Sequence, residues 1–148
     1  MTKETEIRKE ADRLVDTMAR LMGGRMERLM ISLSQGEFGA LRVLSQQDEG
    51  VTSSAISREM SIGPGGVANL LKSLEKKGYI VKETSSEDRR ANSVRITAEG
   101  RAKLEERSDQ VREYVLACLR EIGPDEARVF NDTLNRVLTV SAKFSSEP

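Results

Sequence analysis

The sequence predicts a mainly α-helical fold with one small β-hairpin, and three observations support this fold class. Apolar residues recur at three- and four-residue spacing through most of the 148 residues, which is the period of amphipathic helices. One stretch alternates apolar and polar residues instead, as strands do. Glycine and proline lie where these segments end. The length suits one domain over residues 1–148, and we expect terminal helices at 5–33 and 100–145 to flank a compact lobe at 34–99.

Residues 5–31 carry the first helical pattern. Their apolar positions step four, three, four and three residues and form a heptad-like seam: Ile7, Ala11, Leu14, Met18 and Leu21. Gly23 and Gly24 interrupt it, and a glycine inside a helix costs roughly 1 kcal/mol relative to alanine. Two interpretations are open. The glycines mark a kink or break between two helices, or they form a hinge beside a ligand pocket lined by the adaptable side chains of Met18, Met22 and Met26.

The next segment predicts two short helices. Ser34 and Glu37 have the spacing of a capping box, in which each side chain bonds to the other residue's backbone N–H at a helix start. Thr52 is a residue type that caps the N-terminus of the second helix. The apolar residues behind these starts predict the buried faces: Phe38, Leu41 and Leu44 in the first helix, and Ile56 and Met60 in the second.

The stretch "GPGGVA" at residues 63–68 fits the glycine pattern of a dinucleotide-binding turn, and Glu87 and Asp88 follow about twenty residues later, where such folds hold a ribose. We reject this interpretation because a capped helix, and not a buried strand, precedes the first glycine. Gly63 and Pro64 instead suit the N-cap and first position of a helix that Gly78 ends. The predicted buried face of this helix consists of Val67, Leu70, Leu71 and Leu74.

This helix is the second of a helix-turn-helix, the element that such motifs place in the major groove of DNA. A polar stripe without acidic residues lies opposite its leucines: Gly65, Asn69, Lys72 and Lys76. Asn69 has the chemistry to pair with adenine, and Lys72 can reach guanine or phosphate. Gly65 and Gly66 would let the backbone approach DNA closely. The competing interpretation is that these glycines only permit close packing between helices.

Residues 79–85 and 93–97 predict a β-hairpin with a charged turn. A cation on a thin β-ribbon suits the narrow, negative minor groove, so Arg89 and Arg90 are predicted DNA contacts. Asp88 would accept a hydrogen bond from Arg90 and orient it. The alternative is an ordinary solvated ion pair, worth about 0–1 kcal/mol.

Thr97 predicts the start of a long helix that runs to Ile122, and Pro124 starts another after Gly123. Apolar seams at both ends of the chain would be exposed in a single copy, so we expect them to pair in a homodimer. Cys118 lies on the seam of the long helix, which favours a buried, inert thiol over an oxidant sensor.

Composition excludes several classes of function. The chain has no histidine and one cysteine, so it builds neither a histidine-based triad nor a Cys/His zinc site, and we expect no enzyme, no cofactor and no metal. Without a signal peptide or an apolar run near 18 residues, we expect a cytoplasmic protein with no membrane partner. The 24 Lys and Arg balance 24 Asp and Glu, and residues 51–100 hold eight against six, a net of +2.

Residues 70–100 read "LLKSLEKKGYIVKETSSEDRRANSVRITAEG", with a specific pattern of Leu-Glu-Lys-x-Gly, Asp-x-Arg and Ile-Thr-x-x-Gly. This stretch resembles the MarR family of bacterial winged-helix regulators, and the order of helices extends the resemblance over residues 5–145. The resemblance implies a winged helix-turn-helix lobe and interleaved terminal helices. It also implies a homodimeric repressor on a pseudo-palindromic operator in double-stranded DNA, and a small aromatic or acidic effector that releases it.

Carried over by position, the resemblance makes Arg90 the wing arginine and Asp88 its orienting partner, and Ser53 and Ser54 resemble phosphate contacts. Many relatives carry Ser or Thr where Gly65 and Gly66 stand. Because glycine has no side chain, the resemblance implies no hydroxyl contact with a base or phosphate at these two positions. The predicted DNA-binding residues are Ser53, Ser54, Gly65, Gly66, Asn69, Lys72, Lys76, Arg89 and Arg90. The alternative function is a winged-helix module that binds protein and not DNA, which the small net charge favours.

Overall fold

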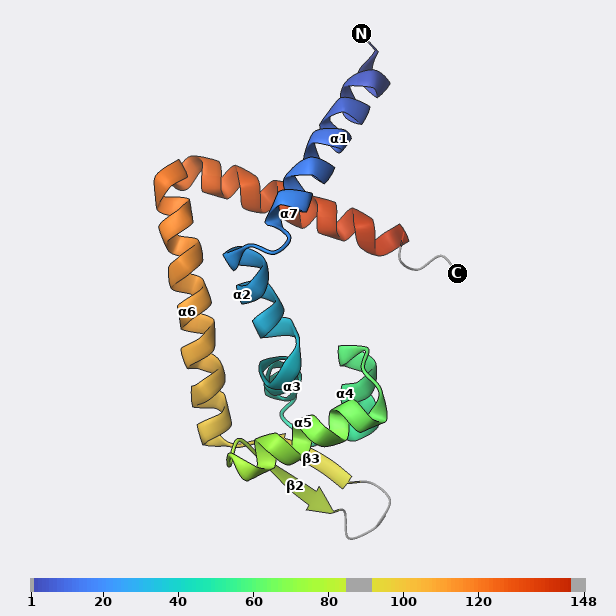
Figure 1. The fold of residues 1–148 in the computed structure, drawn as a ribbon, viewed down its shortest axis with the longest axis vertical. Helices are drawn as coiled ribbons and strands as arrows, with labels where there is room; N and C mark the ends of the chain where they lie inside the picture. Colours follow the sequence, from blue (N-terminus) through green and yellow to red (C-terminus); the bar gives the residue numbers. More distant parts are fainter. Residues whose placement is uncertain (1, 85–91, 145–148) are drawn as a thin grey trace. The chain divides into compact units, whose positions relative to one another are not determined.

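A computed structural model describes residues 2–84 and 92–144 (Figure 1). The predicted fold class is confirmed, since helices dominate and the strands form one small antiparallel sheet. In chain order the elements are α1 (Lys3–Leu21), α2 (Arg25–Ser34), α3 (Gly36–Ser45), β1 (Val51–Thr52), α4 (Ser53–Met60), α5 (Pro64–Lys76), β2 (Ile80–Thr84), β3 (Asn92–Ile96), α6 (Ala98–Ile122) and α7 (Pro124–Phe144).

Backbone contacts divide the chain after Ser108 into two units, and α6 contributes to both. The predicted functional division at residues 34 and 99 stays a prediction. Within the described residues, no helix combines the length and the apolar character needed to cross a membrane.

The N-terminal helical pattern is two helices, as the interpretation of a break predicted. α1 ends at Leu21 and α2 begins at Arg25. Between them Gly23 has a φ of +79°, a left-handed conformation that favours glycine. The Arg28 guanidinium donates to the Gly23 carbonyl across 2.6 Å and holds this turn. A hinge function for the break remains a prediction.

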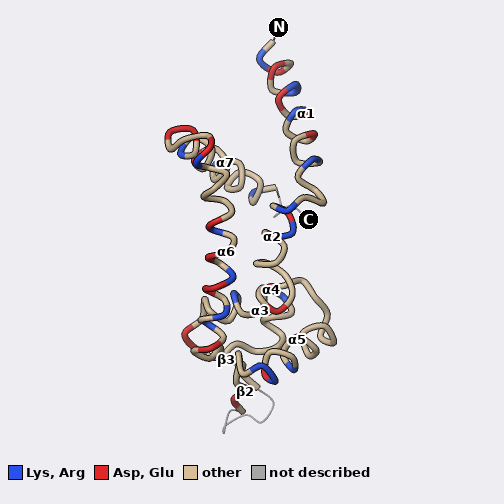
Figure 2. Tube along the Cα trace, turned by 60° about the vertical axis from the view of Figure 1, so that its left-hand side comes forward, with Lys and Arg blue, Asp and Glu red and all other residues tan. Residues whose placement is uncertain are grey.

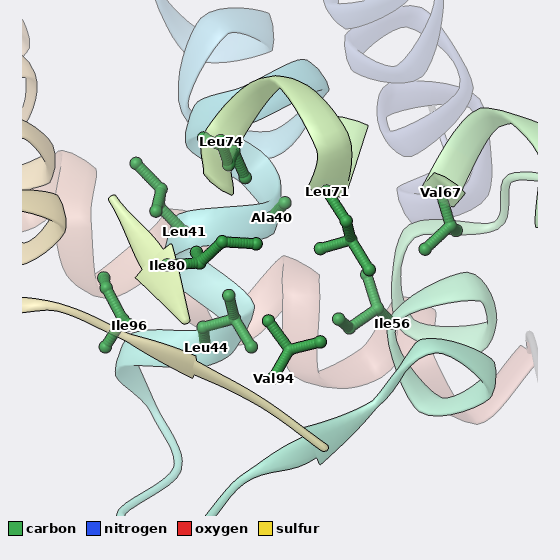
Figure 3. Close-up of a cluster of buried hydrophobic side chains, with 10 residues drawn as sticks. All are labelled: Ala40, Leu41, Leu44, Ile56, Val67, Leu71, Leu74, Ile80, Val94 and Ile96. Carbon is green, nitrogen blue, oxygen red and sulfur yellow. The ribbon is translucent and has the colours of Figure 1, made fainter. Parts of the chain in front are cut away.

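The core of the first unit is built by α3, α4, α5, β2 and β3, whose apolar side chains converge in Figure 3. Its buried members are Ala40, Leu41, Leu44, Ile56, Val67, Leu71, Leu74, Ile80, Val94 and Ile96. The predicted buried faces are confirmed, with Phe38, Met60 and Leu70 only partly buried. Full burial of a side chain such as Leu74 contributes about 1.5–3 kcal/mol, so this cluster stabilises the unit that carries α5.

The sheet contains one strand more than expected. The predicted hairpin pairs β2 with β3, with Val81 opposite Arg95. The short strand β1 pairs with the other edge of β3 and places Val51 opposite Val94. Thr52 ends this strand and also caps α4 as predicted, because its Oγ1 accepts a hydrogen bond from the Ala55 N–H at 3.2 Å.

The predicted capping box at Ser34 is wrong. Ser34 is the last residue of α2, and its hydroxyl donates to the carbonyls of Met30 and Ile31 at 3.3 Å. A residue with helical backbone cannot serve as the N-cap of the next helix, and Gln35 takes that position without a side-chain bond. The carboxylate of Glu37 is therefore available for contacts outside its own helix.

Thr97 joins the start of α6 to the end of α5. Its Oγ1 accepts from the Gly100 N–H at 3.0 Å, as predicted for an N-cap, and it donates to the Gly78 carbonyl at 2.7 Å. Gly100 is buried, and a Cβ there would lie 2.2 Å from the carbonyl oxygen of Tyr79. The glycine of the Ile-Thr-x-x-Gly pattern is thus required by packing.

Three of the terminal helices have apolar residues but bury none of them. α1, α2 and α7 contain no buried residue in the single chain. Cys118 of α6 is also exposed, so its predicted burial does not hold within one copy. The start of α7 at Pro124 agrees with the prediction.

Candidate DNA-binding surface

Local sequence determines where α5 begins and ends. Gly63 is its N-cap and Pro64 its first residue, as expected, and Gly78 follows the C-terminus with a φ of +77°. The buried residues Val67 and Leu71 attach one side of the helix to the core. The opposite side is consequently left at the surface of the unit.

The structure places the predicted residues of α4 and α5 at this surface. Ser53 and Ser54 are the first two residues of α4, and both are exposed. The predicted residues of α5 are all exposed as well: Gly65, Gly66, Asn69, Lys72 and Lys76. Steps of four, three and four residues keep Gly65, Asn69, Lys72 and Lys76 on one helical face. Whether this face binds DNA remains a prediction.

The fold does not require glycine at residues 65 and 66. A Cβ on Gly65 would meet no atom within 4 Å, and a Cβ on Gly66 would meet only Ile62, at an ordinary 3.8 Å. Neither residue has a positive φ. The interpretation that they permit close helix packing is therefore wrong within this chain, and the first turn of α5 offers bare backbone to its surroundings.

The lysines on and near α5 differ in whether they have an acidic partner. Lys77 donates to the Glu37 carboxylate at 2.6 Å, and Lys82 on β2 pairs with Glu75 at 3.2 Å. Lys72 and Lys76 make no hydrogen bond or ion pair with another described residue. Figure 2 shows the Lys and Arg positions along the trace in blue, including those on α5. The exposed stripe therefore carries charges that no acidic side chain in the described part of the chain neutralises.

Glu37 links α3 to the C-terminal end of α5. Its carboxylate accepts hydrogen bonds from the Ser73 hydroxyl and the Lys77 ammonium, and 27% of its side chain is exposed. Burial raises the pKa of Glu37, but the hydrogen bonds from Lys77 and Ser73 and the charge of Lys77 together lower this pKa below its ordinary value. Glu37 thus fixes the end of α5 whose other face carries the lysine stripe.

Sequence reasoning missed two contributors to this region. The partners of Glu37 lie 36 and 40 residues further along the chain, so no local pattern reveals them. Arg58 is exposed on α4 and lines a cavity of about 240 Å³ between α4 and α5. Arg58 follows Ser54 by four residues, a spacing that places both on one helical face and could have identified it.

The remaining predicted residues are three charged residues of the wing and three methionines. Asp88, Arg89 and Arg90 lie outside the described residues, between β2 and β3. The predicted effector pocket draws on three methionines. Met18 on α1 is 57% exposed, Met22 in the break is 67% exposed, and Met26 on α2 is half-buried. The pocket remains a prediction.

Two short helices joined by a tight turn and followed by a paired β-hairpin define a winged helix-turn-helix protein. Residues 31–91, which include α3, α4, α5 and β2, match the family model described as MarR family. Over these residues the chain is similar to the MarR family.

Curated proteins with similar sequences carry related descriptions. The HTH-type transcriptional regulator YdgJ of Bacillus subtilis is 29% identical over 105 residues, which cover 71% of this chain but only 63% of YdgJ. The HTH-type transcriptional repressor Rv2887 of Mycobacterium tuberculosis is 28% identical over 107 residues, which cover 72% of this chain and 76% of the relative.

Solved structures show the same fold. A MarR family protein from Bacillus stearothermophilus superimposes with a TM-score of 0.72 at 17% identity, over 96% of this chain and 99% of the other. An S. aureus MepR mutant bound to an oligodeoxyribonucleotide has a TM-score of 0.61 at 20% identity, over 88% and 96% of the two chains.

Proposed function

We propose that this protein is a sequence-specific regulator of transcription that binds double-stranded DNA. The observation that carries the proposal is the exposed, acid-free stripe of α5, in which Lys72 and Lys76 have no partner among the described residues. A lysine without an acidic partner can neutralise a DNA phosphate. Each phosphate neutralised in this way releases condensed counterions, and this release favours binding. The oligodeoxyribonucleotide bound to the MepR mutant supports DNA as the partner.

In this proposal α5 enters the major groove with its N-terminal turn foremost. The bare backbone at Gly65 and Gly66 allows a close approach, and Asn69 pairs with adenine through its amide. Lys72 and Lys76 neutralise phosphates or reach guanine. Arg89 and Arg90, oriented by Asp88, contact the flanking minor groove.

The active species in the proposal is a homodimer. α7 leaves large apolar side chains open to solvent, including Phe130 at 56% and Val137 at 48% exposure. α1 does the same with Leu14 at 50%. A second copy would cover these surfaces and present two α5 helices to half-sites about 10 bp apart on a pseudo-palindromic operator.

The proposed regulator is a cytoplasmic repressor that a small aromatic or acidic effector releases from DNA. The name of the mycobacterial relative supports repression. Met18, Met22 and Met26 form the proposed effector pocket. A thermal-shift screen of small acids and phenols tests it, and a hit that is unchanged by Met22→Ala would overturn this location of the pocket.

The neighbouring lysines allow a matched test of DNA binding. Lys76→Ala removes a cation that has no partner in residues 2–84 and 92–144, whereas Lys77→Ala removes one that Glu37 already neutralises. Binding to a duplex from the DNA upstream of the gene is measured by fluorescence anisotropy over a series of salt concentrations. We expect Lys76→Ala to reduce the slope of log K against log salt by roughly 0.9 for each phosphate that it leaves without a cation, and Lys77→Ala to leave the slope unchanged.

Equal slopes for both variants would remove α5 from the DNA interface. Wild-type protein that shows no salt-dependent binding to any duplex would favour the second candidate, a winged-helix module that binds protein. The net charge of zero is the observation in its favour. No enzymatic activity or cofactor is proposed.

A further inference from the structure

A cavity of about 240 Å³ lies between α4 and α5, beside the stripe of α5. Its lining contains three hydroxyl groups and one guanidinium but no carboxylate: Ser53, Ser54, Ser57, Arg58, Pro64 and Ala68. A concave site with several donors and one fixed positive charge suits a tetrahedral oxyanion.

The polar groups of the lining fall into two classes. The Ser57 hydroxyl donates to the Ile62 carbonyl at 2.5 Å and holds the turn between the helices, where Ser61 has a φ of +53°. This hydroxyl therefore has a structural role. The side chains of Ser53, Ser54 and Arg58 make no hydrogen bond or ion pair with another described residue.

The backbone of α4 adds further donors. The Thr52 Oγ1 accepts from the N–H of Ala55, whereas the N–H groups of Ser53 and Ser54 belong to the first turn and have no carbonyl partner within the helix. They lie at the same end of α4 as the two free hydroxyls. Among the described residues, the cavity lining thus offers hydroxyl donors and one cation and contains no carboxylate.

We propose that this cavity holds one phosphate of the DNA backbone, bound by the Arg58 guanidinium with the Ser53 and Ser54 hydroxyls. The inference rests on the proposed function and adds Arg58 to it. The first helix of a helix-turn-helix crosses the backbone while the second lies in the groove, so the space between α4 and α5 faces a phosphate strand. The contact positions the protein along the duplex and reads no base.

The test compares Arg58→Gln with Arg42→Gln, a control at an exposed arginine of α3 that does not line the cavity. Binding of each full-length variant to the upstream duplex is followed by anisotropy from low to high salt. We expect Arg58→Gln to weaken binding roughly fivefold and to reduce the salt slope by roughly 0.9 for each chain bound, while Arg42→Gln matches the wild type.

Arg58→Lys separates charge from shape, and circular dichroism confirms that each variant folds. The lysine variant keeps the salt slope but loses affinity, because an ammonium lacks the planar fork of donors. An Arg58→Gln slope equal to that of Arg42→Gln would overturn the phosphate site while leaving DNA binding by α5 in place. A wild-type protein without salt-dependent binding would instead overturn the proposed function itself.

Discussion

The central lobe and the terminal helices use the same apolar residue types with opposite results. In the lobe, ten apolar residues from five elements are at most 6% exposed. In α1, α2 and α7 no residue is buried, although their apolar positions recur just as regularly. The lobe completes its core within one chain, whereas each terminal helix presents an apolar seam for which a single copy supplies no cover.

This difference separates two sources of stability. Convergence of α3, α4, α5, β2 and β3 gives the lobe a closed core (Figure 3). Isolated helices are marginal in water unless an apolar face packs against another element. The lobe is therefore expected to be stable independently of protein concentration, and the terminal helices to gain stability from association.

The largest effect should come from emptying the lobe core. Leu74→Ala removes a fully buried side chain and should lower the free energy of unfolding by about 2–5 kcal/mol. Val137→Ala, at a 48% exposed position of α7, should have little effect at low protein concentration and a larger one as concentration rises. Urea denaturation at several concentrations measures both. A Val137 effect that does not depend on concentration would contradict the comparison.

A smaller effect is expected at the polar link between α3 and α5. Because the pKa of Glu37 is lowered from 4.5, its carboxylate stabilises the fold above that pH, and the contribution is lost as the pH falls through the folded-state pKa. Glu37→Gln should therefore lower the free energy of unfolding by about 1 kcal/mol at pH 7. It should change this free energy very little once the pH lies below the folded-state pKa of Glu37.

Denaturation over a pH series checks this expectation. Glu59→Gln on α4 is the control, because Glu59 is exposed and has no hydrogen bond or ion pair with another described residue. A difference between Glu37→Gln and the wild type that is constant with pH would show that the charge of Glu37 is not what stabilises the link.

The smallest effect concerns Gly65, which no part of its own chain requires to be glycine. Gly65→Ala should raise the free energy of unfolding by about 0.5 kcal/mol, since alanine restricts the unfolded chain and fits the open space. The same methyl group should weaken DNA binding by obstructing the close approach of the backbone. Thermal unfolding tests the expected gain in stability, and anisotropy on the same preparation tests the expected loss of DNA affinity. Unchanged DNA affinity would contradict the proposed role.

Local patterns predicted most of this fold. The caps at Thr52, Gly63 and Thr97, the break at Gly23 and the β2–β3 hairpin depend on neighbouring residues, and the structure confirms them. The capping box at Ser34 failed because α2 continues through that residue. A local rule cannot detect how far the preceding helix extends.

Long-range contacts account for the features that local patterns did not predict. The strand β1 has two residues and exists only because β3 offers an edge. Glu37 is held by residues of a different helix, and the cavity beside Arg58 needs α4 and α5 in place. The predicted stripe of α5 needed only its own helical period, so it was predicted correctly as an exposed face.

The stoichiometry of the protein on DNA tests the proposed dimeric regulator most directly. Sedimentation velocity with a labelled duplex that carries an inverted repeat from the upstream region reports how many chains bind each duplex. We predict a dimer in free solution and two chains per duplex, because the terminal helices pair while each lobe occupies one half-site. A monomer that binds singly, or a dimer that does not bind the duplex, would contradict this prediction.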